Sequence, residues 1–128
     1  MSWRSALGRV EGHGSAKEGV SHWWAQRLSS VALIGLGCWF AVSMLALPGL
    51  DYPTVAAWVR GGLTAPALIL LVVVSAWHSA LGIRAVLEDY VHEVGMKTFA
   101  LALSSFAHVI VAAAGTFAVL RIAFGSAV

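Results

Sequence analysis

Three long stretches of this chain contain no aspartate, glutamate, lysine or arginine: residues 28–47, 63–83 and 98–120. A helix needs about 20 apolar residues to cross the ~30 Å hydrocarbon layer of a bilayer, and each stretch is that long. A segment inside lipid must satisfy its own backbone hydrogen bonds, so each stretch is predicted to be a helix. The chain is therefore expected to be an all-α integral membrane protein with three transmembrane helices.

The overall composition agrees with a lipid environment. Of the 128 residues, 59% are hydrophobic and 11% are charged, whereas an ordinary soluble domain has ~25% charged residues. This excludes a soluble enzyme, because too few polar residues remain to cover its surface. The charges lie at the ends of the stretches and form no basic stripe, so we expect no nucleic-acid partner. Cys38 is the single cysteine, which excludes an intrachain disulfide or a cysteine-based metal site.

The distribution of cations predicts the orientation. Six of the eight Lys and Arg residues fall on the side of the N-terminus, and two fall on the other side. The six are Arg4, Arg9, Lys17, Arg27, Arg84 and Lys97, and the two are Arg60 and Arg121. The excess of cations on the cytoplasmic side of membrane proteins predicts a cytoplasmic N-terminus and a periplasmic C-terminus.

The region before the first stretch is expected to be a cytoplasmic tail, residues 1–27, followed by a membrane anchor domain, residues 28–128. A cleaved signal peptide is the alternative, but the first apolar stretch is longer than a typical signal-peptide core. Glu11 and Glu18 in the tail argue against a mitochondrial transit peptide, which is poor in acids. We therefore expect a multi-pass protein of a bacterial inner membrane.

Two histidines lie within the apolar stretches, where an ionisable side chain is costly and usually has a function. His78 has small neighbours at helical spacing, namely Ser75, Ser79 and Gly82. Small residues allow close approach of another helix, with the histidine as an interhelical hydrogen-bonding group. They also leave room for a planar macrocycle whose iron the imidazole ligates. Both interpretations remain open at this point.

His108 also has small neighbours, and an interhelical hydrogen bond is our default interpretation of it. His78 and His108 are poorly placed to share one iron, because the helical rise puts them about 7 Å apart in depth.

Polar groups at the cytoplasmic ends of the first two helices form a second set of candidates. Tyr90 carries a hydroxyl that can donate to a carbonyl oxygen, and the adjacent Asp89 can pass protons from water. Reduction of a quinone needs such groups, but an interfacial tyrosine beside solvated acids is the plain alternative. Arg27 at the start of the first helix is either a snorkelling cation or a partner for a carboxylate such as a haem propionate.

The segment from His78 to Tyr90 resembles the D-type hydrophobic membrane anchor subunits of succinate dehydrogenase, respiratory complex II. Members of that family carry a histidine, a glycine four residues later and an Asp-Tyr pair, matched here by His78, Gly82, Asp89 and Tyr90. The tail segment 5–9, with sequence SALGR, and Arg27 followed by the small and apolar segment 29–33 are also similar to bacterial members.

This resemblance implies a membrane anchor of succinate:ubiquinone oxidoreductase. His78 would be an axial ligand of haem b, with Ser79 and Gly82 beside the macrocycle and Arg27 near its propionates. Tyr90 would bind a ubiquinone carbonyl, with Asp89 beside it. The implied partners are the C-type cytochrome b anchor subunit, which supplies the second axial ligand, the iron-sulfur subunit and, through it, the flavoprotein subunit. No activity is expected from this chain alone.

Three alternatives stay open. They are a haem-free structural anchor, an anchor of a fumarate reductase, and a small transporter subunit. The absence of charged residues in the three stretches counts against a transporter, because transport sites usually contain intramembrane charges or broken helices. The family pattern assigns no role to His92 or His108.

Overall fold

A computed structural model describes residues 18–125 of the chain. It contains the helices α2 (Glu18–Ala46), α3 (Tyr52–Val59), α4 (Thr64–Tyr90) and α5 (Val94–Phe124). Three of them are long and apolar enough to cross a membrane, over Gly19–Ala46, Thr64–Tyr90 and Val94–Phe124. The prediction of an all-α protein with three membrane-spanning helices is confirmed. Most of the predicted tail, residues 1–17, lies outside the described residues, and residues 18–27 already belong to α2.

The long helices extend beyond the uncharged stretches. The polar segment 84–97 is mostly helical, because α4 continues to Tyr90 and α5 starts at Val94. An ion pair between Arg84 and Glu88, one helical turn apart at 2.8 Å, supports the last turns of α4. Charged residues indicate where a helix leaves the lipid. The helix itself ends where its backbone groups no longer form helical hydrogen bonds. The connection between α4 and α5 is therefore only residues 91–93.

The short helix α3 was not predicted from the sequence. The first long helix ends just before Pro48 and Gly49, as expected of a segment rich in turn residues. Asp51 then caps α3, accepting hydrogen bonds from the backbone N–H and the hydroxyl of Thr54. Pro53 lies in the first turn of α3, where its missing N–H costs nothing. The Asp-Tyr-Pro-Thr sequence was the local signal for this helix.

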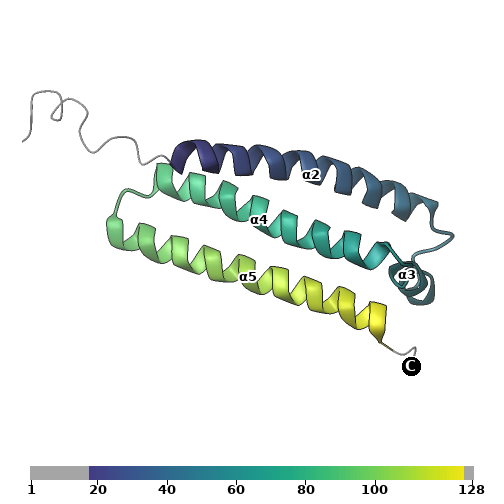
Figure 1. The fold of residues 1–128 in the computed structure, drawn as a ribbon. Helices are drawn as coiled ribbons and strands as arrows, with labels where there is room; N and C mark the ends of the chain where they lie inside the picture. Colours follow the sequence, from purple (N-terminus) through teal and green to yellow (C-terminus); the bar gives the residue numbers. More distant parts are fainter. Residues whose placement is uncertain (1–17, 126–128) are drawn as a thin grey trace, which may run out of the picture.

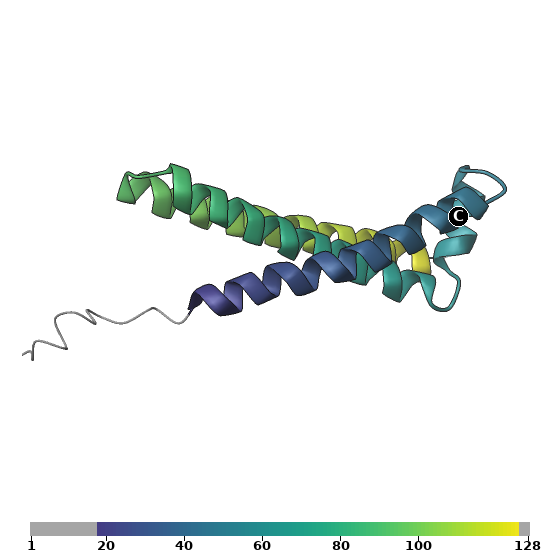
Figure 2. The ribbon, with the colours of Figure 1, turned by 90° about the horizontal axis from the view of Figure 1, so that it is seen from above.

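The helices form one layer with α4 in the centre (Figure 1). Helix α2 packs on one side of α4 and α5 on the other, and within residues 18–125 α2 and α5 make no contact with each other. Helix α2 crosses α4 at an angle, so that the two diverge toward the start of α2 and the end of α4 (Figure 2). We call this the Tyr90 end of the layer, and the opposite end the α3 end.

A single layer of three helices buries little surface. The buried apolar residues of the described chain are Ala56, Val59, Leu68 and Ala76. Large apolar side chains are exposed along α2 and α5, for example Ile34 at 68% and Phe106 at 69%. Exposed apolar surface on this scale is expected of helices that face lipid or further transmembrane helices.

Helices α4 and α5 approach each other closely at one glycine. A methyl group placed on Gly115 of α5 would lie 2.7 Å from Cγ1 of Val72 on α4. Small residues permit this backbone approach, which is how transmembrane helices gain van der Waals packing. At the α3 end, the stacked rings of Trp39 and Trp58, 5.9 Å apart, attach α3 to α2.

Candidate functional site

His78 on α4 forms a hydrogen bond to Ser29 on α2. Nδ1 of His78 lies 2.8 Å from Oγ of Ser29, and Ser29 is only 2% exposed. The same hydroxyl lies 2.8 Å from the carbonyl oxygen of Ala25 and 3.1 Å from that of Gln26. A hydroxyl has one proton, and a carbonyl oxygen can only accept, so Ser29 donates within its own helix and accepts from His78.

This arrangement determines the tautomer of the His78 imidazole. The proton is on Nδ1, which donates to Ser29, and Nε2 keeps its lone pair. Nε2 makes no hydrogen bond to any residue in 18–125. Metal-ligating histidines usually have this arrangement, since the other ring N–H is held by an oxygen of the protein. The donor chemistry of His78 therefore fits the axial ligand of a haem iron.

The described residues hold no group of three His, Cys, Asp or Glu side chains that could bind a metal ion without other ligands. A metal ion at His78 would therefore need most of its ligands from outside the described residues. This is consistent with haem and inconsistent with a mononuclear metal site built from residues 18–125.

The small residues around His78 contact two different helices. Ser79 faces α5, where its hydroxyl lies 3.1 Å from Nε2 of His108. Gly82 faces α2, and a methyl group there would lie 3.8 Å from the amide nitrogen of Gln26, which is ordinary van der Waals distance. The contacts within this chain thus leave space for a methyl group at Gly82. The expected flat face of small residues is in fact divided between the α2 and α5 contacts.

His108 uses both of its ring nitrogens within the protein. Nδ1 lies 2.7 Å from the carbonyl oxygen of Ser104, one turn earlier in α5. That oxygen can only accept, so Nδ1 carries the proton and Nε2 accepts from the Ser79 hydroxyl. The interhelical hydrogen bond predicted for His108 is confirmed. Because Nε2 is already an acceptor, His108 is also unsuited to share an iron with His78.

Two polar atoms in the contact between α2 and α4 are buried without a partner in the described chain, Nε2 of His22 and Oε1 of Gln26. Buried polar groups without partners cost free energy, so such atoms usually mark a missing ligand, water or subunit. His22, Gln26 and Ser29 follow the spacing i, i+4 and i+7 on one face of α2. Sequence reasoning missed this polar stripe, although the spacing on an otherwise apolar helix was the signal.

Arg27 lies close to the level of His78 but does not touch it. It is two residues from Ser29 along α2, or about 3 Å along the helix axis. Its side chain is exposed, and its guanidinium lies 5.1 Å from the ring centroid of Trp23. The cation is therefore stacked on an aromatic ring and has no carboxylate partner among the described residues.

Asp89 and Tyr90 are the last two residues of α4, and both are exposed, Tyr90 at 79%. Neither side chain has a partner among the described residues. Tyr90 is twelve residues from His78, which corresponds to about 18 Å along the helix axis. The structure therefore keeps the Asp-Tyr pair apart from His78, in a position to bind groups from outside this chain.

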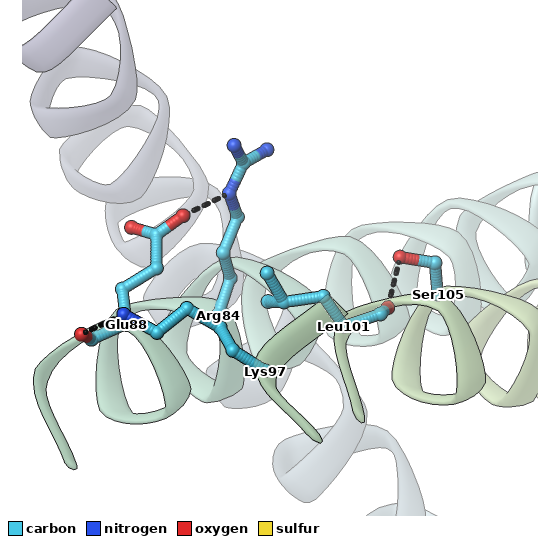
Figure 3. A network of polar contacts seen from close by, with 5 residues as sticks. All are labelled: Arg84, Glu88, Lys97, Leu101 and Ser105. Atoms are coloured by element: carbon cyan, nitrogen blue, oxygen red, sulfur yellow. Dashed lines mark hydrogen bonds and ion pairs between the residues drawn. The ribbon is translucent and has the colours of Figure 1, made fainter. Parts of the chain in front are cut away.

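Contacts on both sides of the short connection hold the Tyr90 end in place. Lys97 of α5 donates to the carbonyl oxygen of Glu88 at 3.1 Å, while Arg84 pairs with the Glu88 carboxylate (Figure 3). Glu93 caps α5 by accepting from the backbone N–H groups of Gly95 and Met96, and these bonds lower the pKa of its carboxyl group.

Beside this end, α2 and α4 diverge around a groove of about 500 Å³. The residues that line the groove are Gly19, Ser21, His22, Ala25, Arg84 and Glu88.

Comparison with known proteins gives a consistent answer. The profile of the family described as succinate dehydrogenase/fumarate reductase transmembrane subunit matches residues 1–117. The succinate dehydrogenase hydrophobic membrane anchor subunit of Paracoccus denitrificans is 35% identical over 121 residues, 93% of this chain and 92% of that protein. The corresponding subunit of Rickettsia conorii is 30% identical over 90 residues, 70% of this chain and 71% of its own length.

No solved structure matches the chain significantly. The family match is nevertheless supported by the three long apolar helices, which lie largely within the matched residues. This chain belongs to the family of succinate dehydrogenase and fumarate reductase transmembrane subunits, and it is a membrane anchor of the succinate dehydrogenase type.

Proposed function

We propose that this anchor subunit helps to bind haem b and ubiquinone in a succinate:ubiquinone oxidoreductase, with His78 as one axial ligand of the haem iron. The hydrogen bond from Nδ1 of His78 to Ser29 carries the proposal, because it leaves the lone pair of Nε2 for a metal. The second ligand comes from the companion C-type cytochrome b anchor subunit, since both nitrogens of His108 are engaged. When bound, the haem supplies a one-electron redox centre near the quinone.

The other residues near His78 accommodate the macrocycle and its charged groups. Ser79 and Gly82 are small, which would let a planar ring approach α4, although within this chain Ser79 contacts α5 and Gly82 contacts α2. Arg27 is exposed, so its guanidinium would be available to pair with a haem propionate. Its present stacking on Trp23 keeps the guanidinium at the Tyr90 end of α2.

Tyr90 and Asp89 bind the quinone. The Tyr90 hydroxyl donates a hydrogen bond to a quinone carbonyl oxygen, and Asp89 transfers protons from the aqueous side to the reduced ring. Their exposure at the end of α4 supports this role, because the quinone and the docked iron-sulfur subunit must both reach them. The Tyr90 end then faces the cytoplasm of a bacterial inner membrane, as the excess of cations on that side favours.

Catalysis is shared between subunits in this proposal. The flavoprotein subunit oxidises succinate, the iron-sulfur subunit carries electrons to the Tyr90 end, and this chain positions the lipid-soluble acceptor. This chain alone is not expected to be active.

A haem-free anchor is the second candidate function. The bond between Ser29 and His78 and the contact of Gly82 with α2 are also what helix packing alone would produce. The two candidates differ in a simple observable, because the haem-free anchor predicts a complex without b-type absorption.

The test uses the complete complex purified in detergent, with His78→Ala compared with His92→Ala. His92 is an exposed histidine outside the proposed site, so its replacement controls for the loss of an imidazole. We expect His78→Ala to alter or abolish the b-type optical spectrum and His92→Ala to preserve it. An unchanged spectrum with full haem content in His78→Ala contradicts the ligand assignment.

Tyr90→Phe tests the quinone site separately. We expect reduced electron transfer from succinate to ubiquinone, while succinate oxidation by an artificial dye is retained. Equal loss of both activities would indicate faulty assembly and would contradict a specific quinone role.

A further inference from the structure

Two arginines meet in a cleft at the α3 end, far from the proposed haem and quinone sites. Arg60 is the C-cap residue of α3, and Arg121 lies in the last turn of α5. They line a cleft of about 660 Å³ together with Tyr52 and the apolar residues Phe117 and Ala118. The cleft therefore combines two cations with an apolar wall.

Neither guanidinium has a carboxylate partner among residues 18–125. Asp51 is the acid at this end of the described chain, and both of its oxygens are bonded to Thr54, at 2.9 and 3.3 Å. These bonds hold the pKa of Asp51 below its ordinary value. The other acids with described side chains, Glu88, Asp89 and Glu93, lie at the Tyr90 end. The described part of the α3 end thus has an excess of positive charge.

Arg60 is held rigidly by the end of α5. Its Nε donates to the carbonyl oxygen of Ile122 at 3.1 Å and its Nη2 to that of Gly125 at 3.1 Å. Cations commonly bind the last carbonyls of a helix in this way. That role explains the position of Arg60, but it does not require a second guanidinium in the same cleft. The remaining N–H groups of Arg60 and the whole guanidinium of Arg121 have no bonding partner in the described chain.

The position of the cleft indicates the ligand. It lies where the membrane-spanning helix α5 ends, which is the depth of phospholipid headgroups in a bilayer. Guanidinium groups match the oxygens of a phosphate with paired hydrogen bonds. The apolar side chains of Phe117 and Ala118 lie about one helical turn further into the span and suit an acyl chain.

We propose that Arg60 and Arg121 form a binding site for the phosphate group of an anionic phospholipid in the leaflet at the α3 end. Binding there joins α3 to α5 through the lipid and adds to the direct contact made by Arg60. A free phosphate ion offers the same chemistry without the acyl chains, so the experiment separates these two sources.

The experiment uses the complete complex, delipidated in detergent, and follows ligand binding by native mass spectrometry and by the rise in Tm. The probes are dioleoylphosphatidylglycerol, dioleoylphosphatidylcholine and inorganic phosphate. Arg121→Gln is the main variant, because Arg121 makes no bond within the described chain and its loss should not unfold α5. Arg84→Gln removes the same charge at the Tyr90 end and serves as the matched control.

We expect wild type to bind phosphatidylglycerol more tightly than phosphatidylcholine, and inorganic phosphate to have no comparable effect. Arg121→Gln should weaken phosphatidylglycerol binding by about tenfold, as expected for the loss of a charge-assisted hydrogen-bonding pair. Arg84→Gln should bind like wild type.

Equal binding of the two lipids by wild type, or undiminished phosphatidylglycerol binding in Arg121→Gln, would overturn the proposal. An equal effect of inorganic phosphate would overturn the lipid as the source of the phosphate.

Discussion

The hydrogen bond between Ser29 and His78 makes a sharp prediction about haem binding. Ser29→Ala removes the acceptor of the Nδ1–H group while leaving the imidazole in place. The bond is 2.8 Å long and its serine is 2% exposed, so no water replaces the lost oxygen without rearrangement. Interhelical hydrogen bonds in membrane proteins contribute ~0.6 kcal/mol on average and up to ~1.7 kcal/mol. Because Ser29 is so well buried, we expect Ser29→Ala to lower the free energy of unfolding by an amount near the upper value, about 1.5 kcal/mol.

The effect on the proposed haem ligand is expected to be larger than the effect on helix packing. Loss of the oxygen that orients a metal-bound histidine typically weakens metal affinity about 10- to 100-fold. The measurement is the transfer of haem from the detergent-purified complex to excess apomyoglobin, followed by absorption. Ser29→Ala should release haem faster than wild type and should also lower the Tm.

Ser30→Ala is the matched control. Ser30 adjoins Ser29 in the sequence, but its hydroxyl bonds only to the carbonyl oxygen of Gln26 in its own helix. We expect Ser30→Ala to retain haem. Its free energy of unfolding should change by no more than about 0.5 kcal/mol, with little change in Tm. If both variants release haem at the same rate, the bond across the helices does not orient His78 and the reasoning is wrong.

Three further predictions concern the packing and the polar ends. Gly115→Ala should destabilise the complex by about 1 to 3 kcal/mol, because the added methyl group overlaps Val72; combining it with Val72→Ala should recover part of the Tm, and no recovery would contradict the contact. His108→Phe should lower the Tm by removing the bond to Ser79 but leave the b-type spectrum unchanged, whereas a changed spectrum would make His108 a ligand. Glu93 has a pKa below its ordinary value of 4.5, so its stabilising contribution is complete above that pH and lost as the pH falls further. Glu93→Gln should therefore flatten the dependence of Tm on pH below about 4.5, and an unchanged acid dependence would exclude this cap as its cause.

Much of the fold could be predicted because it depends on local properties. Each long helix satisfies its own backbone hydrogen bonds in lipid, so length and the absence of charge were enough to locate it. The ends were less predictable, since α4 continues past Arg84 to Tyr90. A charged residue shows that the chain has reached water, but helical hydrogen bonding does not require lipid.

The candidate site was predicted only in part. The sequence alone determined that His78 lies inside a membrane-spanning helix, because hydropathy is read along the chain. Asp89 and Tyr90 were expected beyond the end of that helix, and the structure shows that they belong to it. Only the tertiary structure decided which helix each side chain contacts: His78 reaches Ser29, 49 residues away, while the adjacent Ser79 reaches His108 on the opposite side. The physical reason is that successive residues point about 100° apart on a helix, so their partners depend on where and at what angle the neighbouring helices cross.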